Sequence, residues 1–151
     1  MRRPSFLPLA LAVSLFATAR AEAAEASLTV VFKEIVTPSG AIRAVLYDSE
    51  AAYRSRSTPV RVLTLPVTGA TVQAQVADLP PGRYAISAFH DADGDGKLKT
   101  NAFGVPQEAF AFSNGARAQM GPPGWEAAAF AVVAGQNTQT LVLDSSFVPP
   151  S

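Results

Sequence analysis

Residues 71–90 read TVQAQVADLPPGRYAISAFH and contain two runs with a period of two, one on each side of a strong turn. In the first run, apolar side chains alternate with Gln73 and Gln75, as expected for a strand with one buried face and one solvent-exposed face. In the turn, at 78–82, the two prolines cannot donate hydrogen bonds to a sheet. This stretch therefore predicts two β-strands joined by a turn.

The second run, from Tyr84 to His90, places Tyr84, Ile86, Ala88 and His90 on one face and the intervening side chains on the other. The same period recurs along the chain, so further strands are expected over 28–36, 41–47, 60–67, 127–133 and 138–143. The first two should form a hairpin through the turn 37–40, and 135–137 is the expected turn between the last two. A polar connection over 48–58 is expected to be an exposed loop or a single helical turn. Seven short strands predict an all-β fold, a Greek-key β-sandwich of immunoglobulin-like or transthyretin-like type.

Between Thr100 and Glu126 the alternation fails, and glycines and prolines stand beside phenylalanines and Trp125. The segment is too aromatic for disorder, so we expect a long ordered loop excursion packed on the sandwich. Its aromatic side chains could form a platform for a sugar or peptide, but such residues more often attach a long loop to the core. We therefore expect them to pack against the sheet.

The amino-terminal 1–23 segment has the pattern of a cleaved signal peptide. Arg2 and Arg3 precede an apolar run at 7–19, and small residues allow cleavage after Ala21 or Ala23. The run is shorter than the roughly 20 residues that span a bilayer, so no membrane-spanning segment is expected. The remaining chain should form a single domain over 24–146 with a frayed tail at 147–151. The expected location is the periplasm or the extracellular medium.

The composition excludes several function classes. The chain has 12 basic and 12 acidic residues, one histidine and no cysteine. Disulfides, thiolate metal sites and cysteine nucleophiles are thereby excluded. No run of basic residues exists to neutralise phosphates, so no nucleic-acid partner is expected. A monomer that meets an unidentified envelope or extracellular partner is the expected form.

The strongest chemical motif follows the strand that ends at His90. Three aspartates spaced two apart, Asp91, Asp93 and Asp95, precede Gly96, as in the first half of a calcium-binding loop. The backbone carbonyl of Lys97 would be the fourth ligand. Ca²⁺ requires several oxygen ligands on a curved backbone, and this spacing supplies them.

The second half of the loop departs from the calcium pattern. Lys99 and Ala102 stand where a calcium loop has a water-bridged ligand and a bidentate glutamate. Asn101 comes one residue early, and Glu108 could fold back from the excursion to supply the missing oxygen atoms. Two interpretations stay open: a bound Ca²⁺ ion, or a solvated Asp/Gly turn without a ligand.

His90 is the only histidine, and two roles fit its position. A structural histidine, hydrogen-bonded at the end of a strand, is the simpler reading. The alternative is a metal-assisted hydrolase of envelope material that uses Asp91, Glu108 and His90 around an ion. Because the sequence offers no convergent set of acid, base and electrophile, we favour a non-catalytic binding or accessory module and assign no catalytic residues.

Several short motifs occur in a characteristic order along the chain. They are Leu79–Tyr84, Phe89–Asp91, Asp95–Leu98, Thr100–Asn101, Gly104–Pro106, Phe112–Asn114 and Gly121–Pro123. The series resembles the exported bacterial family catalogued as domain of unknown function 2141, over 28–143. The resemblance implies a β-sandwich and export, and it implies no activity. Members of that family usually carry an acidic residue at the position of Lys99.

Overall fold

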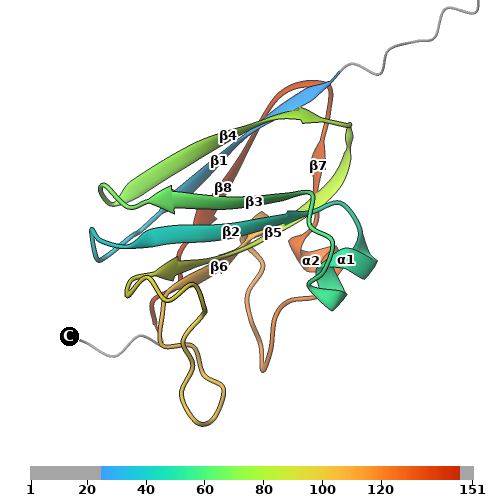
Figure 1. Cartoon of the computed structure of the whole chain (residues 1–151). Coiled ribbons are helices and arrows are strands. Elements are labelled where there is room, and N and C mark those ends of the chain that lie inside the picture. The colour runs from blue at the N-terminus through green and yellow to red at the C-terminus, as the bar shows by residue number, and fades with distance from the viewer. Residues whose placement is uncertain (1–24, 147–151) are drawn as a thin grey trace, which may run out of the picture.

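A computed structural model describes residues 25–146, so the expected signal peptide and the expected C-terminal tail both lie outside the described residues. The described chain is all-β with two short α-helices and one 3₁₀ turn (Figure 1). In chain order the elements are β1 (Ala26–Lys33), β2 (Ala41–Tyr47), α1 (Glu50–Ser55), β3 (Arg61–Pro66), β4 (Thr71–Leu79), β5 (Gly82–Asp91), β6 (Phe110–Phe112), η1 (Ser113–Gly115), α2 (Trp125–Ala128), β7 (Phe130–Val132) and β8 (Gly135–Val142). No helix among these residues is long and apolar enough to cross a membrane.

The strands form two sheets. The smaller sheet has the order β4-β1-β8, with β1 antiparallel to β4 and parallel to β8. The larger sheet has the order β3-β2-β5-β6, and β7 pairs with the beginning of β5. The two sheets form separate layers that face one another, which is the two-layer arrangement predicted from the alternation (Figure 1).

The detailed strand plan differs from the prediction. Residues 25–146 form eight strands rather than seven, because the excursion contributes β6, and the immunoglobulin-like Greek-key connectivity is not confirmed. The expected hairpin between the first two strands is wrong, since β1 uses both of its edges for β4 and β8 while β2 pairs with β3 and β5. Residues 135–137 begin β8 and do not form a hairpin turn, because β7 and β8 belong to different sheets.

The main core lies between the two sheets. Alternate side chains of β1, β2 and β5 face it, and they include Leu28, Val30, Phe32, Ile42, Ala44, Leu46, Tyr84, Ile86 and Ala88. The predicted parity of β5 is confirmed for these last three residues. Consequently, the remaining side chains of β2 and β5, at the alternate positions, face outward. This outer face of the larger sheet carries the candidate site.

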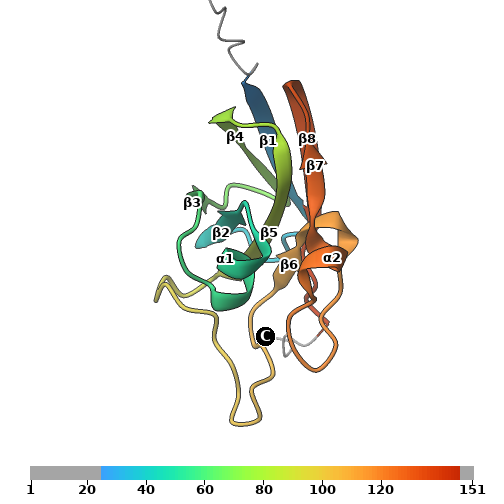
Figure 2. The same cartoon turned by 90° about the vertical axis from the view of Figure 1, so that its right-hand side faces the viewer.

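A second, smaller cluster covers one end of that outer face. Helix α1 begins after Ser49, whose hydroxyl accepts a hydrogen bond from Ala52, and α2 lies beside α1 (Figure 2). Between them, the Tyr53 ring contacts both Tyr47 of β2 and Trp125 of α2 in edge-on geometry. Trp125 is buried and packs against this cluster, as expected for an aromatic residue that attaches the excursion to the sheet.

Candidate functional site

The acidic loop begins at a buried carboxylate. Asp91 is the last residue of β5, and its side chain is inaccessible to solvent. Its Oδ2 atom accepts from Nε of Arg43 at 2.5 Å and from the Gly96 amide at 3.0 Å, while Oδ1 accepts from the Gly94 amide at 2.8 Å. The hydrogen bond from Arg43, aided by the two amides, holds the pKa of Asp91 below its ordinary value despite the opposing effect of burial.

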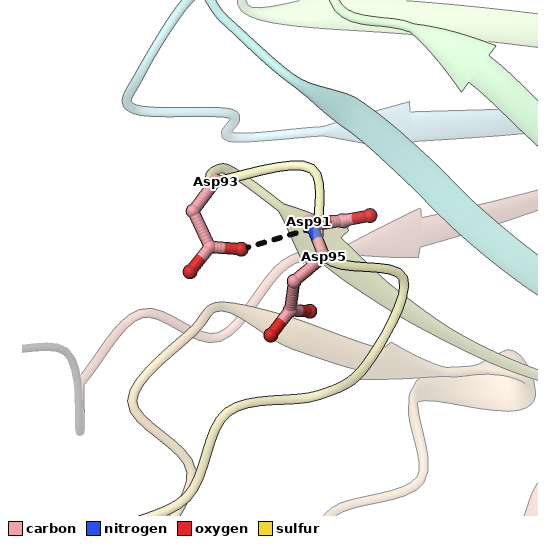
Figure 3. Close-up of side chains that lie close together, drawn as sticks. All are labelled: Asp91, Asp93 and Asp95. Atoms are coloured by element: carbon pink, nitrogen blue, oxygen red, sulfur yellow. Dashed lines mark hydrogen bonds between the residues drawn. The ribbon is translucent and has the colours of Figure 1, made fainter.

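The next two aspartates form successive turns in the same loop. Asp93 accepts from the Asp95 amide at 3.2 Å (Figure 3). Asp95 in turn accepts from the Lys97 amide at 2.8 Å. The left-handed backbone at Gly94 and Gly96, with φ of 79° and 80°, bends the chain between them. The sequence therefore folds locally into a tight bend with its side-chain oxygen atoms arranged around it.

The three carboxylates come together around this bend. Each of Asp91, Asp93 and Asp95 offers one oxygen atom, and these atoms lie within 4.8 Å of one another. A Ca²⁺ ion binds oxygen at about 2.3–2.6 Å, so a single ion can contact oxygen atoms that are this far apart. The cluster could therefore hold a metal ion, and its geometry by itself does not select which one.

Lys99 lies against the cluster. Its Nζ atom is 3.5 Å from Oδ2 of Asp93, and both side chains are substantially exposed. An ammonium group at this position neutralises part of the negative charge and competes with a cation for the same carboxylate. The side chain of Lys97 is exposed, and its backbone amide is already bonded to Asp95.

The other predicted oxygen donors bind backbone amides. Glu108 is buried and folds back as expected, but its two oxygen atoms accept from the Ala92 amide at 3.1 Å and the Lys99 amide at 2.9 Å. Glu108 thus binds the backbone at both ends of the acidic loop. It is not part of the group formed by the three aspartate carboxylates. Asn101 accepts from the amides of Phe103 and Val105 and stabilises a different turn.

His90 is buried on the core side of β5. Its Nε2 atom lies 2.6 Å from the carbonyl oxygen of Ser39, so this nitrogen carries the proton and donates to the turn between β1 and β2. Gly40 in the same turn approaches the backbone so closely that an added Cβ would lie 2.1 Å from the Asp91 carbonyl oxygen. The histidine therefore joins this turn to the end of β5, as expected for a structural role.

A groove of about 670 Å³ runs over the outer face of the larger sheet. Its floor consists of two rows of side chains. Each row runs across β2, β5 and β6 and contains one residue from each strand, paired in register. The first row is Arg43, Phe89 and Phe110, and the second is Val45, Ser87 and Phe112. Phe110 and Phe112 stand edge to face, with ring centroids 6.0 Å apart. The floor is therefore apolar except for Ser87 and the guanidinium at one end.

Two segments of the excursion form the walls. One is a finger over 98–106, closed by a bridge between Thr100 and Pro106, and it contributes Leu98 and the 103–106 tip. The other wall comes from Ala118 and residues 120–122. Both segments extend beyond β6 (Figure 1). The finger starts immediately after the acidic loop, so the loop determines where one wall of the groove begins.

The groove could not be read from the sequence. The alternation predicts that Ser87 and Phe89 lie on the outer face of their strand, but it assigns the third strand of the floor, β6, to a loop. It indicates no role for Arg43, because the partner of Arg43, Asp91, is distant in sequence. The available signal was the alternation of β2, in which Arg43, Val45 and Tyr47 share the face opposite to the core residues.

These features define a class of protein, a two-sheet β domain with a carboxylate-lined loop at the end of a central strand and a groove beside it. Residues 30–140 match the family described as an uncharacterized protein conserved in bacteria, DUF2141, and the chain belongs to that family. The resemblance noted from the motifs is thereby confirmed. No curated protein and no solved structure matches the chain.

Proposed function

We propose that this protein is an exported, non-catalytic binding module that holds a small ligand in the groove over β2, β5 and β6. The observation that carries the proposal is the groove itself, whose volume of about 670 Å³ lies within the range of about 300–1,000 Å³ for small-molecule sites. Its apolar floor and few polar groups also match such sites. A sheet floor holds its residues more rigidly than a loop would, which favours binding.

In this proposal the acidic loop has a supporting role. A Ca²⁺ ion shared by Asp91, Asp93 and Asp95, with the Lys97 carbonyl as a further ligand, orders the bend that leads into the finger. The convergence of three carboxylate oxygen atoms supports this assignment. The ion would fix one wall of the groove and take no part in a reaction.

Export is the third element of the proposal. The basic start, apolar run and small residues of 1–23 support delivery to the periplasm or the extracellular medium. The ligand or partner is then a component of the envelope or of the surrounding medium. Fractionation of cells that express the full-length chain tests this element, and retention of the uncleaved protein in the cytoplasm would contradict it.

The hydrolase alternative has less support. Its three proposed groups each already have a partner: His90 donates to Ser39, Asp91 accepts from Arg43, and Glu108 accepts from two amides. All three are buried. A general acid or base must reach the reacting atoms of a substrate, and these groups point into backbone contacts instead.

The binding proposal is tested with the neutral fluorescent probe N-phenyl-1-naphthylamine. We expect saturable enhancement of its fluorescence by the mature protein. The variant Ser87→Trp fills the floor between Val45 and Phe112 and should abolish the enhancement. Gln75→Trp, an exposed position on β4 in the other sheet, is the matched control and should leave it unchanged. Equal enhancement by both variants, or none by the wild-type protein, would refute a ligand site in the groove.

A further inference from the structure

We propose that the groove selects an elongated apolar ligand that ends in an oxyanion, with Arg43 binding that terminal group. This inference rests on the proposed function and adds the chemical class of the ligand. It follows from the charges that line the groove, the free donors of Arg43, and the position of the aromatic side chains relative to them.

The charged side chains in the groove are of one sign. Among the described residues that line it, Arg43 and Arg56 are the only charged groups, and no aspartate or glutamate is present. Arg43 lies in the floor near the acidic loop, whereas Arg56 follows α1, which packs beside Tyr47 at the other end of β2. An apolar site with cations alone attracts an anion and repels a cation of the same shape.

Arg43 is already held in place for such a contact. Its Nε atom is bonded to buried Asp91, and its guanidinium lies over Gly96, where an added Cβ would be 3.5 Å from Nη2. No described residue accepts a hydrogen bond from Nη1 or Nη2, and the side chain is 34% exposed. A guanidinium has five N–H donors in a fixed fork, so its outer edge can still bind a carboxylate or phosphate through two hydrogen bonds.

The two rows of floor side chains also indicate that the rest of the ligand is apolar. Phe89 lies beside Arg43 in the floor and Phe110 lies beyond it, so a chain anchored at Arg43 would extend across aromatic surface. Phe103 and Met120, one from each wall segment, also line the groove and are almost fully exposed. Exposed large apolar side chains beside an apolar floor gain by covering a hydrophobic ligand.

Calorimetric titration of the mature protein tests this inference with three probes that share a twelve-carbon chain. They are dodecanoate, dodecyl phosphate and dodecyltrimethylammonium, each used below its micellar concentration. We expect both anions to bind at least roughly tenfold more tightly than the cation. Their relative affinities distinguish a carboxylate from a phosphate as the preferred terminal group. Shortening dodecanoate by two carbons should weaken binding by roughly tenfold, because two methylenes leave the apolar floor.

Variants assign the terminal group to Arg43. The double change Arg43→Gln/Asp91→Asn removes the ion pair without leaving a buried charge, and it should strongly reduce the preference for anions, leaving only the weaker effect of Arg56 at the other end of the groove. Arg43→Lys, which keeps the charge but loses the fork, should retain part of that preference. The matched control is Arg54→Gln on the exposed side of α1, outside the groove, and it should change nothing. Melting curves establish that each variant is folded, and the probe series on the wild-type protein provides a test that needs no variant.

The outcomes separate this inference from the proposed function. Equal binding of the anionic and cationic chains, blocked by Ser87→Trp, would overturn the oxyanion specificity and leave the groove as a ligand site. Anion selectivity that is undiminished in the double variant would overturn the role of Arg43. Failure of every chain and of the neutral probe to bind would overturn both proposals.

Discussion

The Arg43 guanidinium lies between the acidic loop and the groove, because its Nε atom donates at 2.5 Å to buried Asp91 while a third of the side chain remains exposed. The first carboxylate of the loop therefore positions the cation in the groove floor. Any change in the loop that moves Asp91 also moves Arg43. The candidate metal cluster and the candidate ligand site are thus physically connected through one ion pair.

Removal of this carboxylate should affect both stability and the groove. In Asp91→Ala, Arg43 loses its partner and two loop amides lose their acceptor, so we expect the melting temperature to fall by roughly 10 °C in the presence of chelator. Asp93→Ala, which removes an exposed carboxylate from the same loop, should lower it by no more than about 2 °C under these conditions. Differential scanning calorimetry makes the comparison, and similar shifts for the two variants would show that Asp91 is not central to the loop.

Calcium should stabilise the folded protein. Because the proposed ion would bind only the folded loop, the melting temperature should rise with Ca²⁺ concentration relative to chelator. Asp93→Ala and Asp95→Ala should each abolish the rise, whereas Asp48→Ala, outside the loop, should retain it. A melting curve that is the same in about 1 mM Ca²⁺ and in chelator would favour the solvated Asp/Gly turn.

Lys99 should weaken cation binding in this chain. Replacing it with glutamate removes an ammonium group 3.5 Å from Asp93 and adds a carboxylate, so we expect Lys99→Glu to tighten Ca²⁺ binding by about tenfold or more. Lys33→Glu on β1, in the smaller sheet, makes the same change in net charge outside the loop and serves as the control. Calorimetric titration with Ca²⁺ measures both, and equal affinities would mean that Lys99 does not compete for the site.

Acid should destabilise the fold through Asp91. Its pKa is lowered in the folded state from an ordinary value of 3.8, mainly by the hydrogen bond from Arg43. The ionised carboxylate therefore contributes stability that is fully present above its unfolded pKa and is lost as the pH falls through the lower, folded pKa. Urea unfolding in chelator should show the free energy of unfolding declining below about pH 4. Asp91→Asn should show a smaller decline, and parallel curves would assign the acid sensitivity to other carboxyl groups.

The turn before β2 should tolerate no side chain at Gly40. This residue has φ of 71°, and an added Cβ would lie 2.1 Å from the Asp91 carbonyl oxygen. We expect Gly40→Ala to cost on the order of 3 kcal/mol of unfolding free energy, from backbone strain and displacement of the end of β5. Gly69→Ala, where an added Cβ meets nothing within 4 Å, is the control. Equal urea midpoints would show that the turn relaxes without cost.

The alternation of side chains was sufficient to predict the class of fold and the faces of its long strands. In β5, for example, the expected core parity of Tyr84, Ile86 and Ala88 is the one observed. It was insufficient for β6, because the three residues Phe110–Phe112 are too few to show a period and lie within a longer segment whose alternation is broken by glycines and prolines. Their place in the sheet is decided by pairing with β5, which is a tertiary contact.

The local sequence pattern also did not predict which strands pair with one another. The turn at 37–40 correctly separates two strands, but it does not determine that they enter different sheets. The same limit applies to the site. The spacing of the aspartates predicted that their oxygen atoms could converge, whereas the capping of the loop by Glu108 and the link from Asp91 to Arg43 depend on residues brought together only by the folded sheet.

The position of β1 between β4 and β8 has a consequence for biosynthesis. The first strand of the described domain obtains its second neighbour only from the last described strand, so the smaller sheet cannot close until residues 135–142 have been synthesised. A chain that stops before residue 135 leaves one edge of β1 without a hydrogen-bonded neighbour, and this edge can then pair with other molecules. Completion of the smaller sheet therefore has to wait for the synthesis of β8.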